Sequence, residues 1–461
     1  MAVWDNIRKT INYARRNGPV SAYYAAMERL SDDRSESYFV SSPEAEELEE
    51  QKRLSLEWVK KRASVPVSVV VPVYMTNENY LRRMISSLIM QSYTNWELIL
   101  ADSSEGDEQA AVINEYAAKD SRIRLLKLEE NEGISGNTNK AIEAARGAYI
   151  AFLDHDDFLE PDALFLMAQA VHDRMSETGG AARCPVKLVY SDEDKCDTEG
   201  LRFFEHHEKP GFNPDYLLTN NYICHFVMAR ADLVKKTKLR PEYDGAQDFD
   251  LLLRLIGDDM FRPGEDKNIV HIPKVLYHWR SHPQSTALNP ASKRYAYDAG
   301  LHAVQDFLDT HGISARVTEL KHVGFYRVEY GTDIFSTRSD IGVVGGRLNN
   351  RLGELVGGNY TDEGKIVFDH LKKGYSGGLQ HRAALQQDVD AVDLRCIKIR
   401  GSLRELLRET TGFLYREHGG IPTESLPEYE VRNRSIRFCK KVREMGYRVL
   451  WDPEWTTEVT R

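Results

Sequence analysis

The residues best suited to chemistry are Asp154 and Asp156, which lie two apart directly after an apolar run at 148–153. On an extended strand end, side chains two apart point to the same side. Paired hard oxygen atoms suit Mg²⁺ or Mn²⁺. Without a cation, each carboxylate would repel an anionic ligand by roughly 4 kcal/mol at about 4 Å and an effective dielectric of about 20. The spacing therefore predicts a metal or ligand site. A loop that caps the next helix is the alternative, and Asp157 is best placed for that role.

Two further acidic segments lie elsewhere in the chain. Asp248 and Asp250 begin a strongly apolar helical pattern, where a helix N-terminus favours anions, and helix capping is the preferred interpretation for Asp250. Asp192 and Glu193 follow a predicted strand at 187–190. These two carboxylates could face a sugar, because carboxylates bind sugar hydroxyls well, but a solvated loop is equally consistent with the sequence.

The elements that must position these residues begin at residue 66. Residues 67–74 are nearly all apolar and β-branched, as a strand covered on both faces must be. Predicted helices at 80–91, 110–119 and 138–145 then alternate with predicted strands at 96–101, 123–128 and 148–153. Pro161 opens another helix at the first-turn position that proline tolerates. The alternation predicts an α/β fold with a mostly parallel, doubly wound, Rossmann-like sheet.

The carboxyl ends of the strands in such a sheet line one edge, and ligands bind there. The first strand ends in Pro72, Val73 and Tyr74, the second strand ends in Asp102, and the fourth ends in the acidic segment 154–157. We therefore expect side chains from separate parts of the chain to meet in a single crevice. This convergence is the main structural reason to predict a site.

Five motifs, in this order and spacing, resemble those of family 2 glycosyltransferases with the GT-A fold. They are Val69–Tyr74, Asp102–Ser104, Asn131–Gly133, Asn137–Ala141 and Phe152–Asp157. The resemblance spans about residues 65–310 and implies a GT-A fold and a nucleotide-sugar donor, with a UDP-sugar as the expected one.

The resemblance also implies roles for residues in these motifs. Those that would hold the donor are Pro72, Val73, Tyr74, Asp102, Asn131, Gly133, Asn137, Lys140 and Asp154. Asp102 would face the base, Asp154 the ribose, and Asp156 the Mn²⁺ or Mg²⁺ ion that binds the diphosphate.

Two later segments extend the resemblance. The residues around Asp248 are similar to the catalytic motif of the family, with Gln247 in place of its glutamate. Asp248 would then be the general base, and a positioned base contributes typically ~10²–10⁴ in rate. The segment 277–282 is similar to one that closes over the diphosphate. There Arg280 would neutralise the diphosphate and His278 would complete the metal shell, with an ordinary buried hydrogen bond as the alternative for His278.

The acceptor side is predicted from the same resemblance, at Asp192, Glu193, Asn221 and Tyr222. The expected reaction is inverting, metal-dependent transfer of a sugar to a hydroxyl of a glycan or lipid-linked saccharide. The resemblance implies a role in bacterial surface polysaccharide synthesis at the cytoplasmic face of the membrane. A catalytically idle sugar-nucleotide-binding scaffold is the alternative. A nucleotidyltransferase is disfavoured, because residues 74–79 lack the glycine and basic residues that grip a triphosphate.

Three domains are expected: a helical N-terminal extension at 1–64, a catalytic domain at 65–310 and a smaller α/β module at 311–461. In the extension, a helix face formed by Trp4, Ile7, Ile11 and Ala14 could touch lipid, but packing against the main domain is favoured because acidic residues soon outnumber basic ones.

Residues 311–461 resemble the later half of a second GT-A domain. No Asp-x-Asp motif precedes this half, and arginines occupy 432–437, where an acidic motif would fall. The module is therefore predicted to be degenerate. It would pack on the first domain, and bind polymeric acceptor or mediate a homodimer.

Composition limits the class of protein. The 461 residues include 61 Lys and Arg against 71 Asp and Glu, and the resulting net charge of −10 disfavours nucleic-acid binding. The five cysteines are scattered without a paired motif, which favours a reducing cytosol. No apolar run approaches the ~20 residues of a membrane span, and the N-terminus does not resemble a signal peptide. We therefore expect a cytoplasmic protein whose membrane contact, if it has one, is peripheral.

Overall fold

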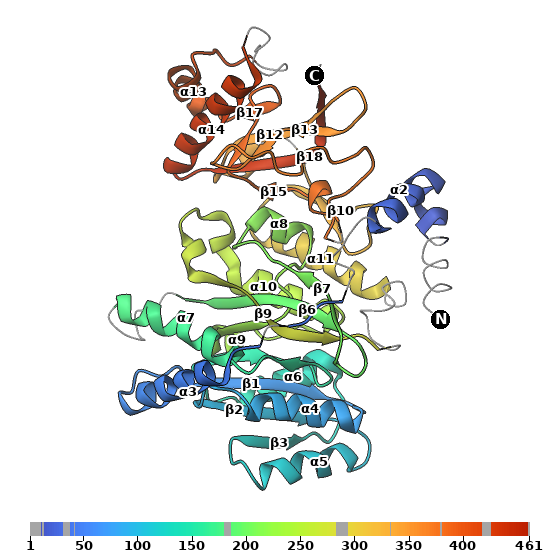
Figure 1. Ribbon diagram of the computed structural model, residues 1–461, viewed down its shortest axis with the longest axis vertical. Coiled ribbons are helices and arrows are strands. Elements are labelled where there is room, and N and C mark those ends of the chain that lie inside the picture. The colour runs from blue at the N-terminus through green and yellow to red at the C-terminus, as the bar shows by residue number, and fades with distance from the viewer. Residues whose placement is uncertain are drawn as a thin grey trace.

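The computed structural model describes residues 11, 13–30, 37–40, 42–178, 186–282, 294–331, 333–378, 380–416 and 426–459. Its largest sheet has the strand order β3-β2-β1-β4-β8-β6-β9-β5, with β7 paired to β6. A smaller sheet lies at the opposite end of the molecule (Figure 1).

One half of the large sheet is parallel and carries the predicted alternation. Its strands are β1 (Val67–Val73), β2 (Trp96–Asp102), β3 (Ile123–Lys127) and β4 (Tyr149–Phe152), connected by helices α4 (Glu78–Ile89), α5 (Glu108–Ala117) and α6 (Gly133–Ala144). Successive strand residues face opposite sides. Val69 and Val71 accordingly pack with α4, and Val70 packs with α6. Each predicted element of this half is present, with ends shifted by a few residues.

The other half of the sheet mixes strand directions. Strand β8 (Val227–Arg230) is antiparallel to β4 and to β6 (Leu188–Cys196). Strand β6 is parallel to β9 (Ile269–Arg280). Of two short strands, β5 (Phe158–Leu159) pairs with β9, and β7 (Phe203–His207) pairs with β6. The predicted strand at 187–190 continues to Cys196, because β9 pairs with β6 along its length. Asp192 and Glu193 therefore lie in a buried strand and not in a solvated loop.

The remaining helices of this domain complete its core. They are α7 (Ala163–Thr178), α8 (Pro214–Thr219), α9 (Ala231–Thr237), α10 (Gln247–Ile256) and α11 (Arg294–Thr310), with 3₁₀ turns at Pro241–Tyr243, Gly257–Phe261 and Glu265–Asn268. A hairpin of β10 (Ala315–Glu319) and β11 (Tyr326–Tyr330) places Val317 and Val328 in the same core. The first domain therefore extends beyond residue 310, where the sequence placed its end.

The C-terminal module has its own sheet and core. Its strands are β12 (Ile341–Asn349), β13 (Leu355–Gly357), β14 (Asn359–Tyr360), β15 (Gln387–Asp388), β16 (Ala391–Val392), β17 (Ile397–Ile399) and β18 (Arg448–Glu458). Its helices are α12 (Ile334–Thr337), α13 (Arg404–Thr411) and α14 (Glu428–Glu444). Two 3₁₀ turns lie at Arg382–Ala384 and Gly401–Leu403. Strands β12 and β18 are parallel, whereas the other pairs of this sheet are antiparallel. Trp451 and Phe438 are fully buried between the sheet and α14.

A buried ionic network joins the module to the first domain. The guanidinium of Arg338 lies between Asp215 of α8 and Asp340, with N–O distances of 2.8 Å to each. Asp388 of β15 completes the network: its Oδ2 accepts a hydrogen bond from Asp215 N at 3.2 Å. A buried pair is costly to break, because the partner left behind keeps an uncompensated charge. The module is therefore firmly docked on the first domain.

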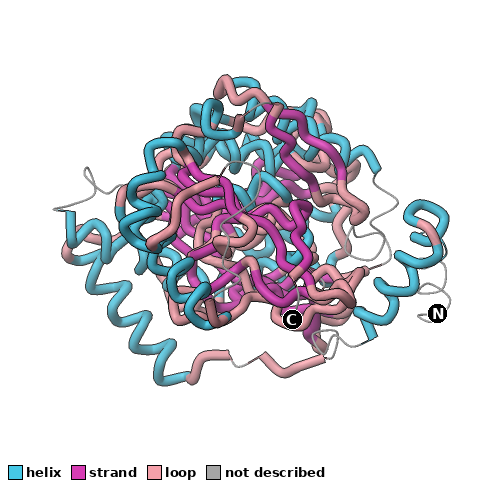
Figure 2. Tube along the Cα trace, turned by 90° about the horizontal axis from the view of Figure 1, so that it is seen from above, coloured by secondary structure: helices cyan, strands magenta, loops and turns pink. Residues whose placement is uncertain are grey.

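The two N-terminal helices lie on opposite sides of the molecule, as Figure 1 and Figure 2 both show. Helix α3 (Ala45–Lys60) packs on the first domain, where Trp58 stacks on His172 at 4.1 Å between ring centroids. Helix α2 (Pro19–Leu30) packs on the C-terminal module instead. Trp4 and Ile7 lie outside the described residues, and Ile11 is 46% exposed. None of the described helices has the length and apolar character that a bilayer crossing requires.

Candidate functional site

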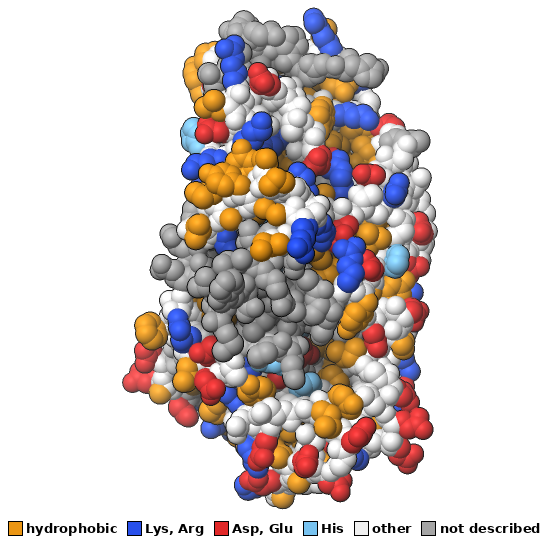
Figure 3. All heavy atoms as spheres, turned by 90° about the vertical axis from the view of Figure 1, so that its right-hand side faces the viewer, with side chains coloured by type: hydrophobic (Ala, Val, Ile, Leu, Met, Phe, Trp, Pro, Cys, Tyr) orange, Lys and Arg blue, Asp and Glu red, His pale blue; other side chains and the backbone are white. Residues whose placement is uncertain are grey.

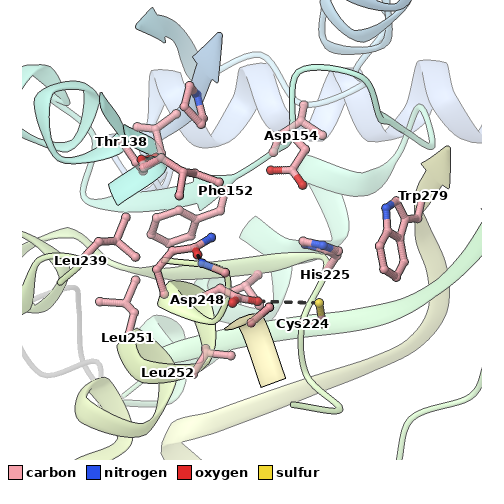
Figure 4. A pocket seen from close by; sticks show the side chains of 18 of the residues that line it. Thr138, Phe152, Asp154, Cys224, His225, Leu239, Asp248, Leu251, Leu252 and Trp279 are labelled. Atoms are coloured by element: carbon pink, nitrogen blue, oxygen red, sulfur yellow. Dashed lines mark hydrogen bonds between the residues drawn. The ribbon is translucent and has the colours of Figure 1, made fainter. Parts of the chain in front are cut away.

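A cavity of about 420 Å³ opens at the carboxyl edge of the parallel strands. Pro72 from the end of β1, Asp154 from the loop after β4, and Asp248 from the first turn of α10 all line it. Figure 4 shows Asp154 and Asp248 entering the cavity from opposite sides, with His225 and Trp279 along one wall. The structure thus brings together two of the acidic segments that the sequence singled out.

Asp248 is held in place by a neighbouring loop. Asn221 Nδ2 donates a hydrogen bond to Asp248 Oδ2 at 2.8 Å, and Asn221 Oδ1 accepts one from Cys224 N at 3.2 Å. Cys224 Sγ also lies 3.8 Å from Asp248 Oδ2 (Figure 4). Among the described residues, no hydrogen bond reaches Asp248 Oδ1. One carboxylate oxygen is therefore fixed, and the other is left without a hydrogen bond from the described chain, at a residue that lines the cavity.

The three aspartates after β4 differ in their environments. Burial raises the pKa of Asp154, and the charges of Asp156 and Asp248 raise it further, against the effect of His225. Asp157 does not cap the following helix: it accepts hydrogen bonds from Tyr277 Oη at 2.5 Å and from the backbone N of Arg280 at 2.8 Å. Asp157 therefore ties the acidic loop to β9, while Asp154 faces the cavity.

Asp156 lies beside two histidines. His282 Nε2 is 2.8 Å from Asp156 Oδ2, and His155 Nδ1 is 3.9 Å from Asp156 Oδ1. Burial acts to raise the pKa of Asp156, but the hydrogen bond from His282 and the charges of both histidines outweigh it, so the pKa is lowered. His155 Nδ1 is buried and has no hydrogen-bond partner in the described part of the chain. A carboxylate with imidazole nitrogens near it, one of them unsatisfied, offers the donor types that suit Mn²⁺ better than Mg²⁺.

His278 does not reach this group. The side chain is fully buried, with Nδ1 2.6 Å from Asp194 Oδ1 and Nε2 2.8 Å from Glu160 Oε1. Burial acts to lower the pKa of His278, but the two carboxylates outweigh it and raise the pKa. Both ring nitrogens of His278 are thus already engaged by carboxylates, and neither is free for a metal. The structure therefore favours His282, and not His278, as the histidine of a metal site.

Arg280 lies beneath the acidic loop. Only 1% of the residue is exposed, and its Nε donates to the carbonyl oxygen of Asp156 at 2.7 Å. The guanidinium also stacks over the ring of Tyr80 at 4.6 Å. These contacts make Arg280 a support of the loop that carries Asp156, instead of the surface contact to a diphosphate that the sequence suggested.

Three of the four predicted acceptor residues are also buried. Asp192 accepts hydrogen bonds from His271 Nε2 at 2.8 Å and from a backbone N–H at 3.0 Å. Glu193 lies 3.3 Å from His207 Nδ1. Tyr222 is 1% exposed, and its hydroxyl accepts a hydrogen bond from a backbone N–H at 2.9 Å. These side chains build the floor beneath the site, so they do not contact an acceptor directly. Asn221 alone of the four is partly exposed, and it contacts Asp248.

A second group of possible ligand atoms lies in the floor. Glu193, Cys224 and His225 each offer one ligand atom, and these atoms lie within 4.8 Å of one another. The ammonium of Lys209 lies 3.8 Å from Glu193 Oε2 and also donates to the carbonyl oxygen of Ile223 at 2.7 Å. Lys209 therefore offsets part of the negative charge of Glu193, while Glu193 Oε2 has no hydrogen-bond partner among the described residues.

Asp102 and the β1 turn lie to one side of the cavity. Asp102 is fully buried, with Oδ1 accepting from Ser104 N at 2.9 Å and Oδ2 from Lys127 Nζ at 3.0 Å. Val73 pairs with Asp102 across the sheet and is also buried, whereas Tyr74 is 46% exposed. The two strand ends are therefore adjacent, as the sequence predicted.

The asparagine-rich segment forms a bonded loop next to this edge. Asn131 Oδ1 accepts hydrogen bonds from Gly133 N at 3.0 Å and from Asn137 Nδ2 at 2.8 Å. Gly133 has a φ of +78°, and a Cβ there would lie 2.9 Å from a side-chain oxygen of Asp244, so glycine is needed. Lys140 points to the surface, 3.4 Å from an exposed glutamate. The asparagines therefore shape the loop at the start of α6.

Sequence reasoning missed the roles of His155, His225 and His282. His155 lies between the two predicted metal-site aspartates, and its spacing was a usable signal. His282 ends the segment that was matched to the family, four residues after His278. Nothing in the sequence indicates which of these two histidines faces Asp156, because that depends on how β9 lies beside the acidic loop.

Comparisons with known proteins agree with this geometry. Residues 68–237 match the model of the family described as "Glycosyl transferase family 2". The chain is 40% identical over 336 residues to the uncharacterized protein y4gI of Sinorhizobium fredii. The matched region covers 69% of this chain and 35% of that protein. It is 34% identical over 269 residues to the O-antigen biosynthesis protein RfbC of Myxococcus xanthus. Here the matched region covers 57% of this chain and 20% of that protein. Among solved structures, TarS of S. aureus in complex with UDP-GlcNAc shows 17% identity and a TM-score of 0.40, over 53% of this chain and 66% of that one.

Residues 68–237, within the domain built on the large sheet, therefore carry a domain of glycosyl transferase family 2. The predicted α/β fold class of the GT-A type, with a mostly parallel first half of the large sheet, is thereby confirmed. The chain spans about a third or less of the lengths of the two relatives named.

Proposed function

We propose that the chain is an inverting glycosyltransferase that uses a divalent metal ion. The donor would be a nucleotide-diphosphate sugar, with a UDP-sugar as the first candidate, and the acceptor a hydroxyl of a glycan or lipid-linked saccharide in a bacterial polysaccharide. The observation that carries this proposal is the placement of Asp248 and Asp154 in one cavity, with Asp156 in the adjoining loop.

The proposed reaction is a single displacement. The acceptor hydroxyl attacks the anomeric carbon, the bond to the diphosphate oxygen breaks on the opposite face, and the hydroxyl proton passes to Asp248 Oδ1. Asn221 holds Oδ2, so the free oxygen keeps one orientation. A base held in hydrogen-bonding reach of its proton is worth typically ~10²–10⁴ in rate. The apolar walls from α10 exclude water and strengthen these interactions.

Asp156, His282 and His155 would hold the metal ion. When bound there, a divalent ion would supply positive charge to offset the negative charge of the departing diphosphate. Arg280 and Asp157 keep the loop in position from below, through the carbonyl oxygen of Asp156 and the backbone of β9. The donor-binding roles of Asp102, Tyr74 and the α6 loop are part of the same proposal, as is a cytoplasmic site of action.

The C-terminal module is proposed to have no catalytic role. Its Arg434 donates to Glu430 Oε1 at 2.8 Å and to the carbonyl oxygen of Thr411 at 2.6 Å, which ties α14 to α13. Arg434, one of the arginines at the place of an acidic motif, therefore has structural partners. Binding of a polymeric acceptor, or pairing of two copies, is the proposed purpose of the module.

The function is tested with a panel of nucleotide sugars, Mn²⁺ and an oligosaccharide acceptor. Asp248→Asn is expected to lower kcat by at least about 10²-fold while nucleotide binding stays near normal. Asp309→Asn, an exposed aspartate on α11, is the matched control and is expected to leave kcat unchanged. Unchanged turnover in Asp248→Asn would refute the base assignment. Binding without turnover for every donor would favour the idle scaffold.

Asn221→Ala distinguishes a positioning role from acceptor binding. Loss of the hydrogen bond to a carboxylate is expected to lower kcat by about 10- to 100-fold and to leave the KM for the acceptor nearly constant. The steady-state parameters for donor and acceptor are measured separately. A rise in the acceptor KM at constant kcat would instead support the direct acceptor contact that the sequence suggested.

A further inference from the structure

Helix α2 carries a row of exposed apolar side chains that the proposed reaction does not use. This row, which we call the α2 stripe, consists of Val20, Tyr23, Met27 and Leu30, which are 65%, 61%, 40% and 83% exposed. Spacings of three and four residues place these side chains on one face of the helix. Isolated exposed apolar residues are common, but a row on one helix face indicates an interaction surface.

The other face of α2 is anchored, so the stripe is held outward. Glu28 is buried, and its carboxylate accepts hydrogen bonds from the backbone N–H groups of Ser376, Gly377 and Gly378 at 2.8 to 3.0 Å. Both glycines have positive φ angles, which lets successive N–H groups converge on one anion. This contact also removes the one acidic side chain of α2 from the surface.

Exposed basic residues belong to the segments that contact α2 and the residues just before it. Asn17 Nδ2 donates to the carbonyl oxygen of Lys321 at 3.1 Å. Tyr24 packs on Gly374, directly after Lys372 and Lys373. These lysines are exposed, and so is Arg29 on the helix itself. Figure 3, which views the side of the molecule where α2 lies, shows an apolar patch with blue lysine and arginine side chains around it.

The geometry points to an anionic phospholipid surface as the partner of the α2 stripe. An amphipathic helix binds such a surface by placing apolar side chains among the headgroups while basic side chains contact the lipid charge. The chain as a whole has a net charge of −10, whereas the exposed charged residue of α2 itself, Arg29, is basic. A second copy of the chain fits less well, because a two-fold contact through the stripe would bring the same basic residues together. This inference does not depend on the transfer reaction.

Vesicle sedimentation with the full chain tests the proposal. Vesicles of phosphatidylcholine with phosphatidylglycerol are expected to bind the protein, whereas phosphatidylcholine alone is expected to bind it at least about ten-fold more weakly, and added salt to release it. Equal binding to both kinds of vesicle, or no binding to either, would overturn the proposal.

Two variants assign the binding to the stripe. Tyr23→Ser with Leu30→Ser is expected to weaken vesicle binding by at least about ten-fold, because both side chains are exposed and their loss leaves the fold intact. The matched control is Leu352→Ser with Leu414→Ser, which removes side chains that are 74% and 70% exposed elsewhere. Unchanged binding in the α2 variant would overturn the proposal. So would a dimer in light scattering that the α2 variant converts to a monomer.

Discussion

Two histidines four residues apart have different predicted roles. His278 bridges Glu160 and Asp194 inside the domain, whereas His282 contacts Asp156. His278→Gln is expected to reduce the free energy of unfolding by about 3–5 kcal/mol, because it leaves buried carboxylates without their cation. Urea unfolding of the variant and of the wild-type protein measures this loss.

His282→Gln is expected to give the complementary result. Its stability should stay near that of the wild-type protein, while its affinity for Mn²⁺ falls at least about ten-fold. Titration of Mn²⁺ by isothermal calorimetry in the presence of UDP checks this. If instead the His278 variant lost Mn²⁺ affinity at normal stability, the assignment of His282 to the metal site would be wrong.

At the scale of single residues, the sequence predicts best those features that depend on position along one element. Asp154 comes directly after β4 and Asp248 begins α10, so the sheet edge brings both to the cavity. His278 could not be placed in this way, because its environment depends on the register β6 makes with β9, where Asp194 lies opposite it. Arg280 was misplaced for the same reason.

At the scale of elements, Glu28 decides how α2 is held. Glu28→Gln is expected to weaken the contact with the N–H groups of residues 376–378, because a neutral amide accepts hydrogen bonds less strongly than a carboxylate. Hydrogen exchange at Gly377 and Gly378, followed by mass spectrometry, should become at least about ten-fold faster.

The control for this variant is Glu49→Gln, an exposed glutamate on α3. Its exchange at Gly377 and Gly378 should match the wild-type rates. Unchanged exchange in Glu28→Gln would mean that other contacts, such as the one between Arg16 and Glu319, hold the helix without it.

Element ends show where local pattern stops being sufficient. The sequence predicts that the strand from residue 187 ends at residue 190, because Asp and Glu, which follow it, are rare in buried strands. Strand β6 continues to Cys196 because His271 and Lys209 supply partners for those acids. These partners come from distant segments, so a local sequence pattern contains no signal for them.

At the scale of the whole molecule, the interface between domain and module should make stability depend on pH. Burial and the charge of Asp215 raise the pKa of Asp388 to about 8, against the effects of Arg448 and Arg338. The ordinary pKa of an aspartate is 3.8. At a pH between these two pKa values, Asp388 holds a proton in the folded chain that it has lost in the unfolded chain. The contribution of Asp388 to the free energy of unfolding is therefore expected to fall as pH rises from about 4 to about 8.

Urea unfolding across this pH range checks the sign. Asp388→Asn should remove part of the pH dependence and be relatively more stable at the upper end, because asparagine resembles the protonated acid. Asp369→Asn, exposed in the same module, should keep the wild-type slope. A pH dependence of stability that is the same in Asp388→Asn as in the wild-type protein would contradict the assignment.

The shared ion network between Asp215 and Arg338 also limits how this protein can change over time. Each partner belongs to a different half of the chain, and the hairpin of β10 and β11 completes the core of the first half. A hybrid gene that joined the first 310 codons to the tail of a relative would have to bring a matching arginine and a matching hairpin with it. The two halves are thus expected to be inherited and exchanged together, as one evolutionary unit.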